Sequence, residues 1–407
     1  MNILKGNAIV GQSGGPTSAI NATLAGVIRG ALEHKEIIKK IYGMRNGIEG
    51  FLKEHLIDLS SVCSDEEHLS CLELTPAAAL GSCRKKLTST EEDGGTYDRL
   101  LELFKKYDIR YFFYIGGNDS MDTVLKLSRF MAEHDYEMRI IGVPKTVDND
   151  LAATDHTPGF GSAAKFVATT IKEIRRDVSV YTVNAVTIVE IMGRDAGWLT
   201  ASSALPCLCG DGPDLIYLPE VSFDPEKFIC DVQSKMKEQP AVLVAVSEGI
   251  RLENGEYVGA SASAVDAFGH KALSGAGKVL ENLVKNRLGC KVRSIELNLP
   301  QRCSAHIASK TDISESLGVG RHAVECAING KTAQMITIIR KDEAEYSVHF
   351  GSSDISGIAN AVRSVPRHFI NDEGNGITSE CISYIAPLIE GEVFPVYEFG
   401  MPKHIKL

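Results

Sequence analysis

The chain has 407 residues, of which 44% are hydrophobic and 24% charged, and its 53 acidic and 43 basic residues give a formal net charge of −10. This composition is that of a globular protein with room for two domains of roughly 100–200 residues, and it excludes a disordered or fibrous chain. The acidic excess argues against nucleic-acid binding, and no segment approaches the roughly 20 apolar residues of a membrane span.

Short apolar segments alternate with helical patterns along most of the chain. Eight runs have strand length, and several of them are near-continuous in Val and Ile, as strands buried on both faces of a parallel sheet are. They are Asn7–Val10, Tyr111–Ile115, Arg139–Val143, Ala185–Ile191, Asp214–Leu218, Ala241–Val246, Val292–Leu297 and Met335–Ile339. Between them apolar residues recur at helical spacing, as from Ile20 to Leu32. The alternation predicts an α/β fold with mostly parallel sheets, the second of them built by the strands from Ala185 to Leu297.

The opening residues contain no long apolar region followed by a small-residue cleavage site. We therefore expect a cytoplasmic protein. Its ten cysteines form no CxxC pair, so we expect reduced, mostly buried thiols rather than a zinc site.

The first of three suggestive turns is GQSGGPT, at residues 11–17, between a predicted strand and a predicted helix. Its glycines allow close approach of a ligand to the backbone, and the helix N-terminus favours a phosphate. An ordinary tight strand-to-helix turn explains the same residues equally well.

The second turn, GGNDSMD at residues 116–122, also follows a strand and opens a helix. Asp119 or Ser120 can cap that helix without any further role. If a phosphate lies there, Asp119 and Asp122 would repel it unless a cation intervenes, and Mg²⁺ is the natural one.

The third turn, PKTVDND at residues 144–150, follows the strand that ends at Val143. Ligands bind at the carboxyl ends of parallel strands, and two aspartates two residues apart can serve as a general base and a metal neighbour. Capping aspartates in a plain turn are the alternative.

Charged residues also fall at the ends of strands in the second half, where Arg194 and Glu248 follow strands and Arg293 and Arg302 bracket the strand Val292–Leu297. Arg194, Arg293 and Arg302 suit phosphate recognition, and Glu248 suits sugar hydroxyls. Each alone is more often a surface charge, but together they place both signs opposite the loops of the first sheet.

These segments together resemble a known family. GGNDS, PKTVDND, TPGFGSAAK and MGRDAGWL, in that order, with LGSCR at Leu80–Arg84 and GQSGGPTSAIN near the N-terminus, closely resemble the 6-phosphofructokinases. The match runs from Gly11 to about Arg302, and beyond about residue 340 it is loose.

The resemblance implies two Rossmann-like domains with the active site in the cleft between them. Residues 1–160 with about 303–332 would form the phosphoryl-donor domain, and 161–302 with about 333–407 the sugar-phosphate domain. It also implies Mg²⁺ as cofactor and a homodimer or homotetramer.

Three positions bear on the phosphoryl donor. ATP-using members of the family read GGDGSxxG and PGTIDND, whereas this chain has Asp119 and Asp122 in place of glycines and Lys145 in place of the glycine before Thr146. A carboxylate fills and repels where a nucleotide's α-phosphate would lie, and an ammonium can bind the donor's phosphates. The resemblance therefore implies transfer from pyrophosphate to fructose 6-phosphate. The alternatives are ATP as donor, or a non-catalytic sugar-phosphate sensor, which would have no need of Asp148.

The resemblance also implies roles for individual residues. Those expected in catalysis are Asp148 as general base, Lys145, Thr146 and Asp150. Those expected at the donor are Gly15, Arg84, Asp119 and Lys145. Those expected at the sugar phosphate are Thr146, Asp148, Met192, Gly193, Arg194, Glu248, Arg293, Leu299 and Arg302. The metal would lie at Asn118 and Asp119, where the family usually has an aspartate in place of Asn118. Leu299 replaces a histidine common in ATP-using members, and Ala185 replaces an arginine that those members send to the neighbouring subunit's site.

Overall fold

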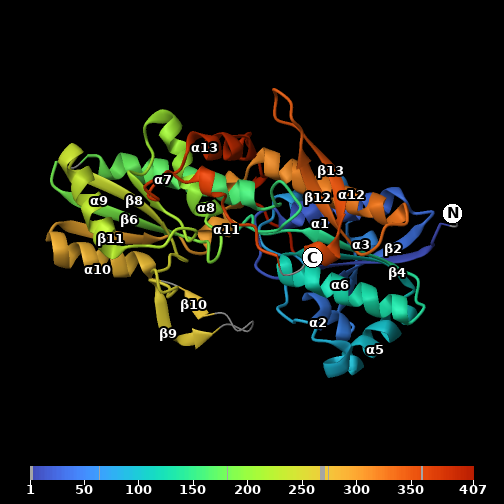
Figure 1. The fold of residues 1–407 in the computed structure, drawn as a ribbon. Coiled ribbons are helices and arrows are strands. Elements are labelled where there is room, and N and C mark those ends of the chain that lie inside the picture. The colour runs from blue at the N-terminus through green and yellow to red at the C-terminus, as the bar shows by residue number, and fades with distance from the viewer. Residues whose placement is uncertain (1–2, 64, 181, 266–270, 274, 359–360) are drawn as a thin grey trace.

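The computed structural model describes residues 3–407 except 64, 181, 266–270, 274 and 359–360, and it has two α/β lobes side by side (Figure 1). The first lobe contains a seven-stranded sheet of order β13-β12-β5-β4-β1-β2-β3, and the second a four-stranded sheet of order β11-β6-β8-β7. The pairings among β12, β5, β4, β1 and β2 are parallel, as are all pairings in the second sheet, while β3 and β13 are antiparallel edges. The predicted α/β class with mostly parallel sheets is confirmed.

The strands of the first sheet are β1 (Gly6–Gln12), β2 (Ile38–Met44), β3 (Leu56–Asp58), β4 (Ile109–Gly116), β5 (Arg139–Pro144), β12 (Gln334–Arg340) and β13 (Val348–Asp354). Those of the second are β6 (Ala185–Ile191), β7 (Leu215–Tyr217), β8 (Ala241–Ser247) and β11 (Lys291–Glu296). Two antiparallel hairpins stand apart, β9 (Ala260–Val265) with β10 (Lys271–Leu273), and β14 (Tyr397–Glu398) with β15 (Met401–Pro402). All eight predicted strands are present.

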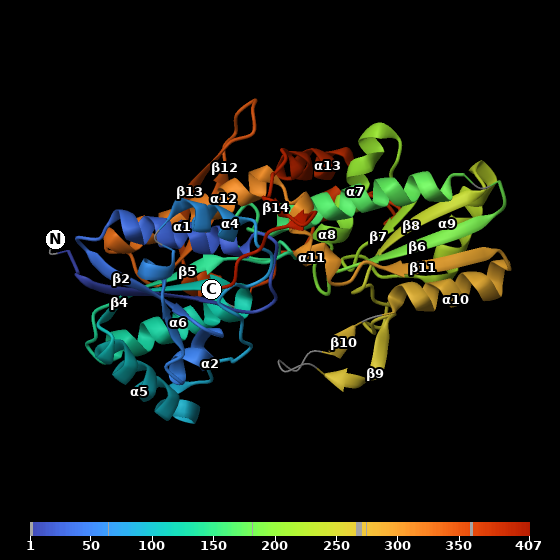
Figure 2. The same ribbon diagram turned by 180° about the vertical axis from the view of Figure 1, so that it is seen from behind.

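Helices cover both faces of each sheet, as the view from behind also shows (Figure 2). In the first lobe they are α1 (Ile20–Glu33), α2 (Gly47–Leu52), α3 (Leu59–Val62), α4 (Glu66–Glu73), α5 (Thr90–Lys106), α6 (Asn118–Glu133) and α12 (Lys310–Ile328). The others are α7 (Phe160–Val178), α8 (Trp198–Ala201), α9 (Pro225–Glu238), α10 (Ala276–Leu288), α11 (Pro300–Cys303) and α13 (Ser379–Ile385). Short 3₁₀ segments span Ser202–Cys209, Ala305–Ile307, Ile355–Gly357, Arg367–Phe369 and Ala386–Ile389.

Each sheet therefore has two apolar cores. In the first lobe α1 and α12 share one core and α2, α5 and α6 the other. In the second lobe α7, α8 and α13 pack on one face and α9 and α10 on the opposite face. Burial on both faces is the physical reason that these strands read as continuous Val and Ile runs.

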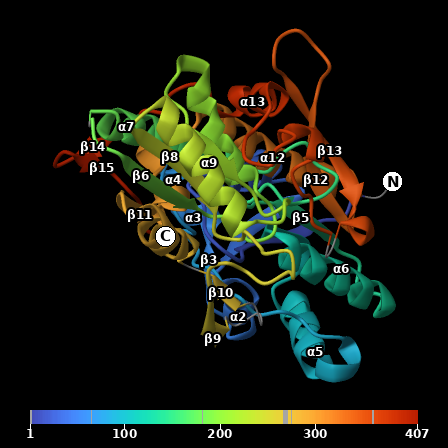
Figure 3. The same cartoon turned by 60° about the vertical axis from the view of Figure 1, so that its left-hand side comes forward.

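The C-terminal segment from residue 334 onward returns to both lobes. β12 pairs with β5 and β13 with β12, so residues 334–354 extend the first sheet. This corrects the predicted assignment of about 333–407 to the second domain. Further along, Cys381, Ile385 and Leu388 are buried in the core of the second lobe, and the β14–β15 hairpin projects at the left of Figure 3.

Among the described residues, no helix combines the length and the apolar character needed to cross a bilayer. All ten cysteines are free thiols. The expectation that most of them are buried is wrong, because only Cys63, Cys83, Cys326 and Cys381 are buried and four others are exposed.

Candidate active site

The first loop, after β1, is shaped by its neighbours. Ser13 donates its backbone N–H to Ile115 O at the end of β4 (2.9 Å), and Gly14 donates to Cys83 O (3.1 Å). Gly14 has a φ of +75°, a left-handed conformation that glycine adopts without steric cost. These contacts hold the backbone of Gly15 beside the loop that follows β5.

Lys145 joins the first loop to the third. Its side chain is almost fully buried, and its Nζ donates to Gly15 O at 2.5 Å. Burial lowers the pKa of Lys145 to about 8, against the raising effect of the Asp148 and Asp150 carboxylates, and the nearby Arg302 and Arg84 lower it further. The cation of Lys145 therefore lies against the backbone of the first loop, which the resemblance assigns to the phosphoryl donor.

The two aspartates of the third loop have raised pKa values. Burial, followed by the charges of Asp150 and Glu248, raises the pKa of Asp148 to about 7, although Lys145 and Arg194 act in the opposite direction. Burial likewise raises the pKa of Asp150. Because it is half-titrated near neutrality, Asp148 has the proton affinity that a general base needs.

Thr146 and Asn118 organise this loop. Thr146 Oγ1 accepts the backbone N–H of Asp148 at 3.1 Å. Asn118, the first residue of α6, donates its Nδ2 to Asp150 Oδ2 at 3.3 Å. The described residues offer no hydrogen-bond partner to the buried Asn118 Oδ1, which leaves an amide oxygen available beside a carboxylate.

The second-loop aspartates lie beside lysines. Asp119 Oδ1 is 3.4 Å from Lys86 Nζ, and Asp122 Oδ2 is 2.7 Å from Lys126 Nζ. Lysines thus stand next to the two carboxylates for which the sequence suggested a metal ion. The structure brings Asn118 toward Asp150 rather than toward Asp119.

The loops after β6 and β8 interlock in the second lobe. Gly193 N donates to Glu248 Oε1 at 3.3 Å, and the Ser247 hydroxyl donates to Gly193 O. A Cβ on Gly249 would lie 1.9 Å from Arg194 O, so only glycine allows this approach. The buried Arg194 Nε finds no hydrogen-bond partner among the described residues. Met192, next to this pair, donates its N–H to Gln301 Oε1 of α11 at 3.1 Å.

Arg302, which follows the last strand of the second sheet, reaches the first loop. Its Nη1 lies 3.0 Å from the position a Cβ would take on Gly15. Burial, followed by the neighbouring charge of Arg84, lowers the pKa of Arg302. Asp148 in turn is within electrostatic range of Glu248 and Arg194. Cations and carboxylates from both lobes therefore converge on one place, as a site for polyanions requires.

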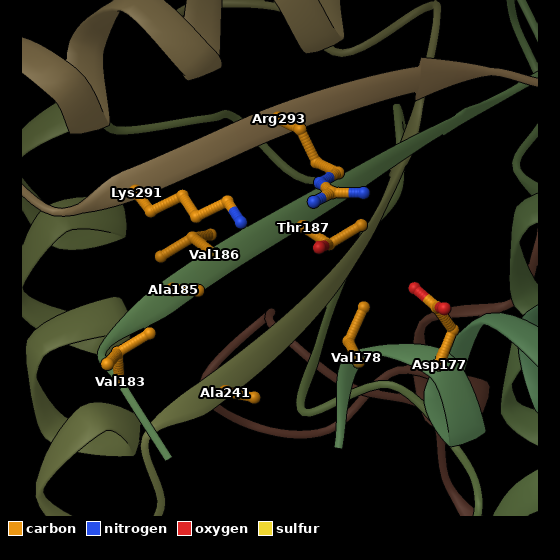
Figure 4. A pocket seen from close by; sticks show the side chains of 9 residues that line it. All are labelled: Asp177, Val178, Val183, Ala185, Val186, Thr187, Ala241, Lys291 and Arg293. Atoms are coloured by element: carbon orange, nitrogen blue, oxygen red, sulfur yellow. The ribbon is translucent and has the colours of Figure 1, made fainter. Parts of the chain in front are cut away.

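Two of the expected sugar-phosphate residues do not join this group. Arg293 is exposed and pairs with Thr187, four residues before β6 ends at Ile191. It lines a small hollow with Lys291, Asp177 and Ala185, at the opposite end of the sheet from the loops (Figure 4). Leu299 is 52% exposed at the start of α11.

Known protein families offer a parallel to this arrangement. A family model described as Phosphofructokinase matches residues 7–327. The chain belongs to the phosphofructokinase family.

Two curated relatives and one solved structure are similar to this chain over nearly their whole length. The chain is 43% identical to the pyrophosphate–fructose 6-phosphate 1-phosphotransferase of Halomonas elongata and 41% identical to that of Methylococcus capsulatus, in each case over 98% of this chain and 96% of the relative. The crystal structure of a pyrophosphate-dependent phosphofructokinase from Nitrosospira multiformis superposes with a TM-score of 0.90 at 40% identity, covering 99% of this chain and 96% of the other.

Several residues around the site were not identified from the sequence. Lys86 lies two positions after Arg84, so its place next to the LGSCR segment could have identified it as a candidate site residue. Gln301 is next to Arg302 and could have been considered for the same reason. Arg363 and Tyr384, which contact the third loop, lie in the weakly patterned tail, where no motif singles them out.

Proposed function

We propose that this phosphofructokinase transfers a phosphoryl group from pyrophosphate to the 1-hydroxyl of fructose 6-phosphate, giving fructose 1,6-bisphosphate and orthophosphate. The observation that carries the proposal is the buried Lys145, whose ammonium lies against the donor loop at Gly15. Full-length relatives named for this reaction support it. We also propose that the protein acts in the cytoplasm as a homodimer or homotetramer.

The donor half favours a small, highly charged donor. Lys145 and Arg302 lie against Gly15, and the charge of Arg84 is close enough to both to lower their pKa values. Asp119, next to Lys86, fills space at the mouth of the second loop. A carboxylate at that place excludes a nucleotide by bulk and by like charge, whereas the end of a pyrophosphate needs less room.

Asn118 and Asp150 would hold Mg²⁺. The fit rests on the buried, unpartnered Asn118 Oδ1 and the adjacent Asp150 carboxylate, because Mg²⁺ binds through hard oxygen ligands together with substrate phosphates. When bound, the metal would offset negative charge on the phosphates. Asp119, the other expected ligand, instead lies beside Lys86.

The side chains divide the remaining work. Asp148 takes the proton of the 1-hydroxyl, whose oxygen forms the new bond to phosphorus as the bridging P–O bond of pyrophosphate breaks. Lys145 stabilises the negative charge on the departing orthophosphate. Arg194, Glu248, Met192 and Gly193 would orient the sugar phosphate.

The test is steady-state formation of fructose 1,6-bisphosphate with pyrophosphate and, separately, with ATP. We expect turnover with pyrophosphate and little with ATP at millimolar concentration. Asp148→Asn keeps the shape of the loop but removes the base, so its kcat should fall by about 10²–10⁴. Preference of the unmodified protein for ATP would overturn the proposal, and near-normal turnover of Asp148→Asn would remove Asp148 from its role.

A further inference from the structure

Asn149 lies between Asp148 and Asp150 in the third loop and has a left-handed backbone conformation. Its φ is +52° and its side chain is fully buried. Left-handed backbone is uncommon for a residue with a Cβ, although asparagine adopts it more readily than most, so the contacts of its side chain decide how firmly Asn149 is held there. This one residue sets the relative directions of Asp148 and Asp150.

The side chain of Asn149 is bound at both ends. Its Oδ1 accepts the backbone N–H of Thr157 at 3.1 Å. Its Nδ2 therefore faces the hydroxyl of Tyr384, to which it donates at 3.4 Å. Tyr384 belongs to α13, more than two hundred residues away in the sequence.

The Tyr384 hydroxyl uses its full hydrogen-bonding capacity. It donates to Asp155 O at 2.6 Å and accepts from Arg363 Nη2 at 3.2 Å as well as from Asn149. One donor and two acceptor positions are all that a hydroxyl offers. Its position is thus determined from three directions.

The Tyr384 ring is fixed by parts of both lobes. The Arg340 guanidinium, at the end of β12, lies 4.5 Å from the ring centroid, and Arg340 Nη1 donates to Tyr384 O at 3.1 Å. On the other side the ring contacts Trp198 of α8, with centroids 5.4 Å apart, and Phe369 at 5.7 Å. Tyr384 is therefore held between the first sheet and the loop that follows Arg194.

The same tail also contacts the loop backbone directly. Arg363 N donates to Asp150 O at 2.8 Å, and Leu151 forms an antiparallel bridge with Val362. The tail thus holds the loop on the C-terminal side of Asn149, and Tyr384 holds Asn149 itself.

We propose that Tyr384 is a positioning residue for the phosphoryl transfer: its hydroxyl holds Asn149 in the left-handed conformation that orients Asp148 and Asp150. The inference rests on the proposed function for its kinetic consequence. It assigns a role in the reaction to a C-terminal segment that the resemblance to the family matches only loosely.

The decisive variant is Tyr384→Phe, which keeps the ring contacts and removes the hydroxyl. We expect kcat with pyrophosphate to fall about tenfold, because small misplacement of reacting groups is costly, while both KM values stay within about twofold. Tyr136→Phe is the matched control, because its buried hydroxyl also donates to backbone carbonyls, those of Phe104 and Ile109, far from the loop. That control should lose stability without this loss of kcat.

A second variant separates the effect of the Asn149 backbone conformation from the effect of its side-chain hydrogen bond. Asn149→Gly permits the left-handed conformation but cannot bind the Tyr384 hydroxyl, so adding Tyr384→Phe to it should lower kcat no further. An equal loss in both backgrounds would overturn the proposal, as would parental kcat in Tyr384→Phe.

A crystal structure of Tyr384→Phe gives a readout that needs no activity. We expect Asn149 to leave its left-handed conformation or its contact with Thr157. An unchanged loop would overturn the positioning role even if the protein used another donor. Failure of the proposed function would instead appear in the unmodified protein, as absence of pyrophosphate turnover.

Discussion

Asp148 and Lys145 must be in opposite protonation states for the reaction. The base must be deprotonated and the ammonium protonated, with pKa values of about 7 and about 8 respectively. Activity should therefore rise as pH increases through 7 and fall as it increases through 8. We expect a bell-shaped pH profile of kcat/KM, which reports the ionisations of the free enzyme.

Lys145→Arg isolates the alkaline side of that profile. An arginine stays protonated throughout, so this variant should lose activity overall yet retain it at alkaline pH relative to its own maximum. Because the ionisation of pyrophosphate is common to both proteins, the comparison is between their normalised profiles. An alkaline limb unchanged by the substitution would mean that Lys145 is not the group that titrates.

We predict that Asp119 and Lys145 together determine which phosphoryl donor the protein uses. Asp119→Gly opens space beside Lys86 but leaves the ammonium of Lys145, so ATP should bind weakly without becoming a good donor. Lys145→Gly should lower kcat with pyrophosphate, since its charge matters most as the leaving phosphate forms. The double variant should show the largest shift in the ATP-to-pyrophosphate ratio of kcat/KM, with non-additive effects because both residues face one donor. A ratio that stays at the parental value in all three variants would contradict this assignment.

At the scale of elements, most of the strands that the sequence predicted are buried on both faces, although β11 alternates between exposed and half-buried residues. β2 was missed because its Ile38 and Ile41 are separated by two exposed lysines at 39 and 40. β13 was missed because it is a half-exposed antiparallel edge with a polar sequence. β12 was predicted as a strand, but its apolar sequence would fit the first sheet or the second equally well. Its pairing with β5 is therefore visible only in the three-dimensional structure.

One helix is capped by another. Asp312 of α12 accepts the backbone N–H groups of Gly159 (2.8 Å) and Ser162 (2.9 Å) at the start of α7. The carboxyl group is buried, so its loss leaves two donors without partners. We expect Asp312→Ala to lower the free energy of unfolding by about 1–3 kcal/mol, measured by urea denaturation.

An exposed cap gives the comparison for Asp312. Asp224 accepts the N–H groups of Glu226 and Lys227 at the start of α9, where water can replace the lost oxygen. Asp224→Ala should therefore cost less than Asp312→Ala. Equal losses would show that capping from α12 adds nothing beyond an ordinary helix cap.

At the scale of the molecule, the sequence motifs identified candidate catalytic loops at strand ends but not the residues that hold these loops in place. Lys145, Asp148, Arg194 and Glu248 were predicted because each follows a strand of recognisable pattern. Tyr384 was not, because contacts between distant segments leave no local signature in one sequence.

Arg293 is a predicted site residue that lies away from the other site residues within one copy of the chain. It pairs with Thr187, four residues before the end of β6, roughly 13 Å at 3.3 Å per residue. Its neighbours in the hollow of Figure 4 include Ala185 and Ala241, the first residues of β6 and β8. If Arg293 binds sugar phosphate, as the resemblance implies, it must do so in another copy of the chain.

Subunit mixing tests this arrangement of Arg293. We expect Arg293→Ala to raise KM for fructose 6-phosphate while KM for pyrophosphate stays nearly fixed, and Asp148→Asn to be nearly inactive. At subsaturating fructose 6-phosphate, refolding the two variants together should then restore intact sites, up to about a quarter of the parental activity for a two-fold dimer. That quarter follows because half of the dimers are mixed and each has one intact site of two. Activity no higher than the sum of the separate variants would place Arg293 outside any shared site, and a parental KM in Arg293→Ala would remove it from substrate binding altogether.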